Sequence, residues 1–303
     1  MNWKEAIKDY QYYLRLERGL SENSIASYSL DVEKLAEFVA DWEDAPGPLE
    51  IEEETVQQFI YSLSKKLSAP SQARVISGLR SFFSYLIFEE YRSTNPMDLM
   101  ESPRTTRKLP DTLSTGEIDE LIGAIDLSQP EGERNRAIIE TLYSCGLRVS
   151  ELVALRLSDL FFEEGFIRVT GKGNKQRFVP ISPTTIKYIL LYKNQVRIHM
   201  PIKNTAEDIL FLNRRGGQLT RAMIFTLVKR LAQAAGIEKR VSPHTFRHSF
   251  ATHLLENGAD LRAIQQMLGH ESITTTEIYV HTDRSHLKKV MEKYHPRRPQ
   301  EDQ

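Results

Sequence analysis

The first ninety residues repeat apolar side chains at the 3.6-residue period of an α-helix, and this repeat restricts their fold more than any other feature. Four amphipathic stretches follow one another, separated by short polar segments. Their apolar positions are Ala6, Ile7, Tyr10, Tyr13 and Leu14; Ile25, Tyr28, Val32, Leu35, Val39 and Trp42; Val56, Phe59, Ile60 and Leu63; and Val75, Ile76, Leu79, Phe82, Phe83, Leu86 and Ile87. Ser21 or Asn23 is the expected cap of the second helix. The pattern predicts a small four-helix bundle within residues 1–94.

A proline-rich basic segment follows the bundle. Pro96, Pro103 and Pro110 surround the run RTTRK at residues 104–108. Prolines interrupt helices and strands, so residues 95–112 are predicted to link two domains. The cations of this segment could follow a DNA backbone between the domains, and an ordinary exposed linker explains them equally well.

Residues 113–303 combine helical patterns with short alternating ones. Ser114 and Glu117 form a capping-box signature, and a helix is expected from about Glu131 to the stop at Gly146. Two strands, 166–169 and 178–181, flank the polar turn GKGNKQR, which predicts a β-hairpin. Further helices are expected at 186–196 and 220–231, with a short strand at 209–212. The second domain is therefore predicted to be α+β.

Charge is distributed unevenly along the chain. The net charge is only -1, but residues 1–107 hold 12 Lys and Arg against 18 Asp and Glu, whereas residues 108–303 hold 28 against 23. Between residues 41 and 54 there are seven carboxylates and no Lys or Arg, while residues 55–88 contain four cations and no acid. One face can therefore be basic while another stays acidic, although a solvated helical surface gives the same pattern.

Composition excludes several classes of protein. No apolar run approaches the roughly 18 residues of a membrane span, and the first residues lack a signal-peptide core. The single cysteine, Cys145, excludes an internal disulfide and a cysteine-based zinc cluster, and it is expected to be buried. We therefore expect a cytoplasmic protein with no membrane partner.

The stretch 242–282 gathers polar side chains that suit phosphate chemistry. His244 and Arg247 lie three residues apart at the start of a helix whose apolar face is formed by Phe250, Ala251, Leu254 and Leu255. A second short helix, with Leu261, Ile264, Met267 and Leu268, ends at Gly269, just before His270. Tyr279 follows nine residues later. Two imidazoles, a guanidinium and a phenol suggest a phosphate pocket with an attacking hydroxyl.

Two other motifs are ambiguous when taken alone. GLRVSEL, at 146–152, places Arg148 three residues before Glu151, which by default is a surface ion pair. Lys172 lies in the glycine-rich hairpin turn, where a lysine is usually an exposed turn residue. The turn lacks the spacing of a Walker phosphate loop. HTFRH resembles a zinc-binding helix, but Thr245 replaces the expected Glu and Arg247 adds an unfavourable charge.

Together these motifs, in this order, resemble the tyrosine recombinase (phage integrase-like) family, and closest of all its Xer branch. The resemblance covers essentially the whole chain and rests on GLRVSEL, GKGNKQR, HTFRH, LGH and TEIYVHT. It implies a mainly α fold with a small β-hairpin or sheet: an N-terminal four-helix, SAM-like core-binding domain (1–94) and a C-terminal α+β catalytic domain (113–303).

The resemblance also implies roles for individual residues. The catalytic set would be Arg148, Lys172, His244, Arg247, His270 and the nucleophile Tyr279, with Glu151 supporting Arg148 and His281 lying close to the nucleophile. Forming a phenolate at neutral pH costs about 4 kcal/mol, which cationic neighbours must offset. Neither a metal nor another cofactor is expected, because the side chains supply the positive charge.

The expected substrate is a double-stranded DNA recombination site. The candidate DNA-contacting cations are Lys65, Lys66, Arg74, Arg80 and Arg221. The branch implies a homotetramer, or a heterotetramer with a XerC-like recombinase, that resolves chromosome dimers under the control of a septal DNA translocase. The apolar stripe of residues 285–294 could dock into a neighbouring subunit or pack on its own domain.

Three alternatives use the same residues or part of them. A mobile-element integrase would differ only in its target sites. A type IB topoisomerase would relax supercoils at many sequences. A non-catalytic DNA-binding regulator is disfavoured, because only cleavage requires all six catalytic residues.

Overall fold

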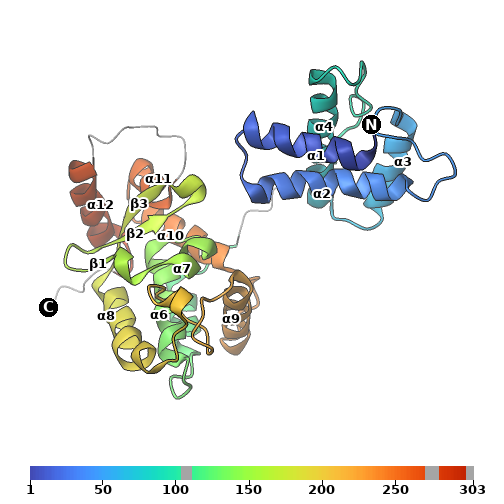
Figure 1. Ribbon diagram of the computed structural model, residues 1–303. Coiled ribbons are helices and arrows are strands. Elements are labelled where there is room, and N and C mark those ends of the chain that lie inside the picture. Colours follow the sequence, from blue (N-terminus) through green and yellow to red (C-terminus); the bar gives the residue numbers. More distant parts are fainter. Residues whose placement is uncertain (104–110, 270–279, 298–303) are drawn as a thin grey trace. The chain divides into compact units, whose positions relative to one another are not determined.

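The computed structural model describes residues 1–103, 111–269 and 280–297, with the backbone alone described for residues 172 and 280–283. The chain divides into two compact units, Met1–Lys108 and Leu109–Gln303. The fold is mainly helical, with a small antiparallel sheet in the second unit (Figure 1).

Helices form the N-terminal unit, as its apolar repeat predicted. They are α1 (Trp3–Leu16), α2 (Glu22–Val39), α3 (Glu53–Ser64) and α4 (Ala69–Phe88). α2 packs against the other three, and most of the predicted apolar positions form one buried cluster, with Tyr13, Tyr28 and Ile60 partly buried against it. The Ser21 hydroxyl accepts from the Ser24 amide and caps α2. Met97 and Met100, beyond α4, also belong to this core.

One residue of the second apolar pattern lies outside the helix. α2 ends at Val39, and the side chain of Trp42 is 37% exposed. Trp42 instead packs edge-on against Phe38, with ring centroids 5.6 Å apart. The helical period therefore continues in the sequence for three residues after the helix has ended.

The second unit surrounds its sheet with helices. They are α5 (Thr115–Gly123), α6 (Gly132–Cys145), α7 (Val149–Ala154), α8 (Pro183–Leu191), α9 (Arg221–Ala234), α10 (Pro243–Glu256), α11 (Leu261–Leu268) and α12 (Val280–Tyr294). α6 is buried along most of its length and packs against α8 and α10, so it is the central helix of this unit (Figure 1). Cys145, its last residue, is fully buried, and burial raises the pKa of its thiol.

The sheet consists of β1 (Leu160–Phe161), β2 (Phe166–Thr170) and β3 (Gln176–Pro180) in the order β1-β2-β3. The predicted hairpin is confirmed: β2 and β3 are antiparallel, and Thr170 pairs with Gln176. A short 3-10 turn, Lys172–Asn174, connects them, and Gly173 there has a φ of 70°. The sequence did not predict β1, which is only two residues long.

Several predictions in the second unit need correction. The expected strand at 209–212 does not form, because its residues make only isolated bridges, Arg156 with Ile209 and Leu212 with Gln218. Leu255 was assigned to the apolar face of α10 but is 53% exposed. A residue adjacent to Leu254 is rotated by about 100° around the helix axis, which carries it off the buried face.

The C-terminal helix packs on its own unit. Leu287, Val290 and Met291 of α12 join a buried cluster with residues of α10 and α11, among them Phe250 and Met267. Of the two alternatives for this apolar stripe, the structure has the intramolecular one. No helix in the described part of the chain has both the length and the apolar character needed to span a membrane.

Candidate active site

The site begins where α6 ends. Gly146 stops the helix in the left-handed region at φ 57°, and a Cβ atom there would lie 2.5 Å from the Phe250 ring. Glycine is therefore needed for both backbone conformation and space. The turn places Arg148 at the N-cap of α7, where its amide donates to Glu151 Oε2 at 2.8 Å.

Glu151 is a buried carboxylate shared by two arginines. Arg148 Nη1 donates to its Oε1 at 2.9 Å, while Arg177 forms a fork, with Nη1 to Oε1 at 2.8 Å and Nη2 to Oε2 at 2.9 Å. Burial would raise the pKa of Glu151, but the hydrogen bonds and charges of the two arginines lower it overall. The carboxylate is therefore held in its charged form.

Arg247 approaches from α10 and is only 6% exposed. Its Nη1 donates to the Gly146 carbonyl at 2.8 Å and its Nη2 to the Leu268 carbonyl at 2.6 Å. Burial, and then the nearby charge of Arg148, lower the pKa of Arg247 to about 10. The guanidinium remains protonated at neutral pH and carries its charge into the interior.

The C-terminal end of α11 draws these arginines together. Gly269 caps the helix at φ 67°, and the Leu268 carbonyl accepts from both Arg247 and, at 3.4 Å, Arg148. The Met267 carbonyl accepts from Arg177 Nε at 2.8 Å. The partial negative charge at a helix C-terminus favours cations there. Helix end and Glu151 together hold three guanidinium groups within the described part of the site.

This arrangement suits the binding of an oxyanion. The side chain of Arg148 is 42% exposed, and in the described ranges nothing accepts from its Nε or Nη2. Three positive charges face a single carboxylate and three helix-end carbonyls, those of Gly146, Met267 and Leu268. Guanidinium groups bind phosphate through paired N–H donors and can stabilise charge that develops on its oxygens.

The structure brings together three of the residues singled out from the sequence: Arg148, Glu151 and Arg247. His244 lies in the first turn of α10, one turn before Arg247, and is exposed. Lys172 begins the turn between β2 and β3, but its side chain lies outside the described atoms. His270 and Tyr279 lie outside the described residues, as does the side chain of His281 in α12.

Arg177 was not singled out from the sequence. It is the last residue of GKGNKQR and lies in β3, and its side chain is only 14% exposed. The sequence signal for Arg177 was its position in GKGNKQR, a motif that was interpreted only for Lys172. Its contacts with Glu151 and Met267, 26 and 90 residues away, cannot be inferred from local spacing.

Two of the candidate DNA contacts in the N-terminal unit have intramolecular partners. Arg74 donates to both oxygens of the buried Asp31, at 2.8 and 2.5 Å. Arg80 Nη2 donates to the Met100 carbonyl at 2.7 Å. Both side chains therefore have a structural contact in addition to any contact with DNA.

The other candidate DNA contacts lie at exposed helix ends. Lys65 and Lys66 are exposed where α3 ends, and Lys65 Nζ lies 4.5 Å from the centroid of the Tyr61 ring. Arg221 is exposed at the start of α9. Exposed cations of this kind are suited to contacts with phosphates.

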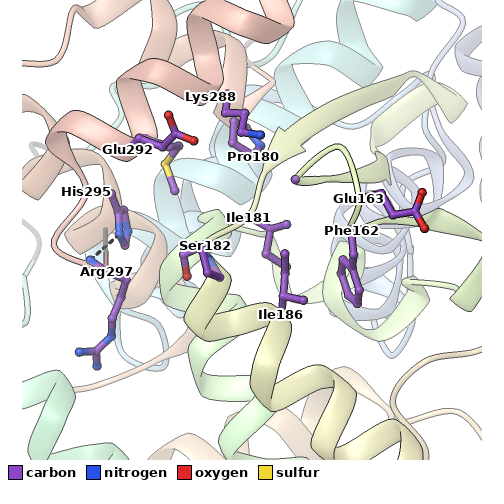
Figure 2. A pocket seen from close by; sticks show the side chains of 13 residues that line it. Phe162, Glu163, Pro180, Ile181, Ser182, Ile186, Lys288, Glu292, His295 and Arg297 are labelled. Carbon is purple, nitrogen blue, oxygen red and sulfur yellow. Dashed lines mark hydrogen bonds between the residues drawn. The ribbon is translucent and has the colours of Figure 1, made fainter. Parts of the chain in front are cut away.

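A separate cavity of about 170 Å³ lies where α12 and the residues after it pack against the sheet and α8 (Figure 2). Ile181, Ile186, Met291 and His295 are among the residues that line it. His295 is fully buried, which lowers its pKa to about 3, and its Nδ1 accepts from the Arg297 amide at 3.0 Å. The cavity shares no residue with the arginine cluster, so it reflects the packing of the C-terminal segment.

No set of three or more His, Cys, Asp or Glu side chains converges on a common point in the described ranges, so these ranges contain no identifiable metal site. In the cluster at the end of α11, the described positive charge comes from Arg148, Arg177 and Arg247.

Comparison with known families accounts for both units. The phage integrase family model matches residues 111–286, and the phage integrase N-terminal SAM-like domain model matches residues 7–90. The first match contains the arginine cluster, and the second contains α2, α3, α4 and most of α1.

Curated relatives are similar over almost the whole length. Tyrosine recombinase XerD of Oceanobacillus iheyensis is 43% identical over 96% of this chain and 98% of its own. Tyrosine recombinase XerD of Staphylococcus haemolyticus is 42% identical, with the same coverage of 96% and 98%. Among solved structures, XerH site-specific recombinase bound to its difH substrate in a pre-cleavage complex is 28% identical, with a TM-score of 0.67 over 93% of this chain and 82% of that one.

Proposed function

The chain belongs to the phage integrase family of tyrosine recombinases, enzymes that cut and rejoin DNA, and we propose that it acts at one specific site to resolve chromosome dimers. The similarity to XerD relatives over 96% of the chain supports the Xer branch. A chromosomal substrate would place this activity in the cytoplasm.

The observation that carries the proposal is the cluster of Arg148, Arg177 and Arg247 around the end of α11. A scissile phosphodiester carries one negative charge and gains more as its phosphorus is attacked. Preorganised guanidinium groups are suited to stabilise that growing charge. In the proposed complex Arg148 and Arg247 bind the non-bridging oxygens.

The remaining roles are assigned by the family motifs. Tyr279 is the proposed nucleophile: its oxygen forms a bond to phosphorus and the 5′-oxygen of the next nucleotide leaves, giving a 3′-phosphotyrosyl enzyme. His244 assists removal of the phenolic proton, and Lys172 protonates the departing 5′-oxygen. His270 donates a further hydrogen bond to the phosphate.

Rejoining reverses this chemistry. A 5′-hydroxyl of another strand attacks the phosphotyrosine, the phenol leaves, and a phosphodiester forms again. Because the covalent intermediate retains the energy of the original ester, no ATP is required. Two rounds of strand exchange proceed through a Holliday junction, and cationic side chains take the place that metal ions have in other phosphoryl transfers.

The proposed assembly is a tetramer on two DNA sites. It is a homotetramer or contains a XerC-like recombinase, and a septal DNA translocase activates it. Outside the active site, Lys65, Lys66 and Arg221 are the proposed phosphate contacts, because they are exposed at the ends of α3 and α9.

The test uses covalent capture. A pool of nicked duplexes with randomised arms is incubated with the protein, so that cleavage beside the nick releases a short strand and traps the adduct. Wild type should form an adduct that survives denaturation, and sequencing the trapped DNA gives the preferred site. Tyr279→Phe should bind the same duplexes without forming an adduct. The absence of any adduct with wild type would refute the proposal.

A second experiment tests specificity. A plasmid carrying two directly repeated copies of the selected site should lose the intervening segment, and EDTA should not slow this reaction. Efficient relaxation of a supercoiled plasmid without the site would instead identify a topoisomerase.

A further inference from the structure

We propose that Arg177 is a positioning residue, which occupies Glu151 and the end of α11 so that Arg148 stays free to bind the scissile phosphate. The inference rests on the proposed function of the arginine cluster and extends it to a residue that does not itself touch DNA. Its basis is the set of contacts that Arg177 makes and Arg148 does not.

Arg177 uses its whole guanidinium group within the protein. Nη1 and Nη2 donate to the two oxygens of Glu151, at 2.8 and 2.9 Å, and Nε donates to the Met267 carbonyl at 2.8 Å. Its side chain is 14% exposed, against 42% for Arg148. Arg177 is therefore suited to hold other groups, whereas Arg148 is suited to reach a ligand.

Gly269 leaves space that this arrangement needs, and Gly171 lies within ordinary contact distance of the same side chain. A Cβ atom at Gly269 would lie 3.0 Å from Arg177 Cδ and 3.1 Å from its Nε. A Cβ atom at Gly171 would lie 3.6 Å from Arg177 Nη1. The side chain is thus enclosed between the hairpin turn and the C-cap of α11, and its position determines how closely these two segments approach.

Electrostatics gives Arg177 its proposed effect on Arg148. Glu151 is only 4% exposed, so its carboxylate needs a bidentate partner. Arg177 supplies that fork, and the guanidinium of Arg148 then contacts Glu151 through Nη1 alone. Without Arg177, the carboxylate would bind Arg148 through two N–H donors. The donors that Arg148 otherwise keeps free would then point away from the phosphate.

The contact with Met267 has a second consequence. It ties the C-terminal end of α11 to β3, the strand that follows the Lys172 turn. His270 follows the α11 cap directly in sequence. Arg177 therefore links the two segments that lead in sequence to two of the proposed catalytic residues.

The experiment measures single-turnover cleavage on a nicked duplex that carries the site selected by wild type. Arg177→Met should slow covalent adduct formation on the order of 10²-fold, the effect of misplacing a catalytic group by about 1 Å. Arg177→Lys keeps the charge but loses the two paired N–H donors. It should therefore restore only about a tenth of the rate that Arg177→Met loses. DNA affinity, measured for both variants in the Tyr279→Phe background, should change little.

The matched control is Arg168→Met. Arg168 lies on β2 of the same sheet, and its Nε pairs with Asp159 at 2.8 Å instead of with Glu151. This variant loses an Arg–carboxylate contact in the same sheet but leaves the hydrogen bonds of Glu151 in place, so it should cleave at the wild-type rate. Thermal unfolding of all variants shows whether a loss of rate reflects a loss of folded protein.

A double variant distinguishes positioning from a purely structural role, because a structural role predicts no increase in the cleavage rate. If Arg177 acts by occupying Glu151, neutralising that carboxylate should release Arg148 again. Glu151→Gln combined with Arg177→Met should therefore cleave faster than Arg177→Met alone. If the double variant cleaves no faster than Arg177→Met, the proposal is overturned. This holds even if Arg177→Met folds poorly.

The last part of the experiment uses a substrate whose scissile phosphate is uncharged. A methylphosphonate at the scissile position lacks one negative oxygen, so a defect that acts through Arg148 should shrink on it, for Arg177→Met as for Arg148→Ala. An undiminished defect, or wild-type cleavage by Arg177→Met, would refute the positioning role alone. Failure of wild type to form any adduct would refute the proposed function itself.

Discussion

Each unit of the protein buries a carboxylate beside arginine, and the two sites differ in their balance of charge. In the N-terminal unit, Asp31 is 1% exposed and accepts from both Nη atoms of Arg74, with Lys34 Nζ at 3.6 Å. Burial prevails there and the pKa of Asp31 is raised. At Glu151 two arginines prevail over burial and the pKa is lowered.

The comparison separates a structural ion pair from an anion-binding site. Both Nη atoms of Arg74 donate to Asp31, and Nη1 also donates to Ser27, so these donors are used within the protein although the side chain is 48% exposed. Glu151 is occupied by Arg177, so Arg148 keeps free donors, and the buried Arg247 adds a further positive charge. Free guanidinium donors beside a buried acid, more than the acid itself, indicate the binding of an oxyanion.

The strongest test of this contrast removes the exposed arginine of each pair. Arg148→Ala should slow covalent adduct formation by about 10³-fold, because it deletes a preformed donor to the transition state. Arg74→Ala should leave the rate of adduct formation near that of wild type at saturating protein. The measurement is single-turnover cleavage of the nicked duplex. Equal losses in the two variants would remove the proposed distinction.

Neutralising the two acids should give a smaller difference. Glu151→Gln keeps the shape of the side chain but weakens its hold on both arginines, so cleavage should fall by roughly 10-fold to 10²-fold. Asp31→Asn lies in the other unit and should cleave like wild type. The same cleavage assay compares them, and a slow Asp31→Asn variant would show that the N-terminal pair also influences catalysis.

The salt dependence of binding tests which cations contact DNA. Lys66→Ala should reduce the slope of log affinity against log salt concentration by about 0.9, the value for one phosphate contact. Arg74→Met should change the slope less, because its guanidinium already binds Asp31. Fluorescence anisotropy in the Tyr279→Phe background measures both. A larger change for Arg74→Met would place its guanidinium on the DNA backbone.

The smallest effect is an opposite dependence on pH. The lowered pKa of Glu151 means that its stabilising contribution is present above the ordinary carboxyl pKa, about 4.3, and is lost as pH falls through the folded value. The raised pKa of Asp31 means that its destabilising charge is present above the folded value and disappears as pH falls toward about 3.9.

From neutral to acidic pH, wild type should therefore lose stability relative to Glu151→Gln and gain stability relative to Asp31→Asn. Each change should stay below about 1 kcal/mol, because Arg148 and Arg74 are partly exposed to solvent. Hydrogen exchange of peptides covering α7 and α2, corrected for intrinsic exchange rates, measures the two effects. Changes of the same sign would contradict the comparison.

The sequence predicted those parts of the fold that depend on local chemistry. The caps at Ser21 and Ser114 and the helix stops at Gly146 and Gly269 follow from backbone rules, and the structure has them. The expected strand at 209–212 failed because its partners, Arg156 and Gln218, provide single bridges instead of a ladder.

Prediction of the site from the sequence had a different limit from prediction of the fold. Family motifs identified Arg148, Glu151 and Arg247, but no spacing rule shows that Arg247 is buried against the Gly146 carbonyl, 101 residues away. Arg177 was missed for the same reason, since its role depends on two distant segments meeting. The arrangement of a charged cluster is a property of tertiary packing, which periodicity does not encode.

The left-handed turn at Gly146 limits how this site can change over generations. One backbone segment ends α6, makes room for Phe250, and offers its carbonyl to Arg247. A mutation there would disturb three requirements at once, and no single second mutation could restore them all. We expect laboratory evolution toward new target sequences to leave this corner unchanged and to accumulate its substitutions elsewhere, on surfaces that touch the bases.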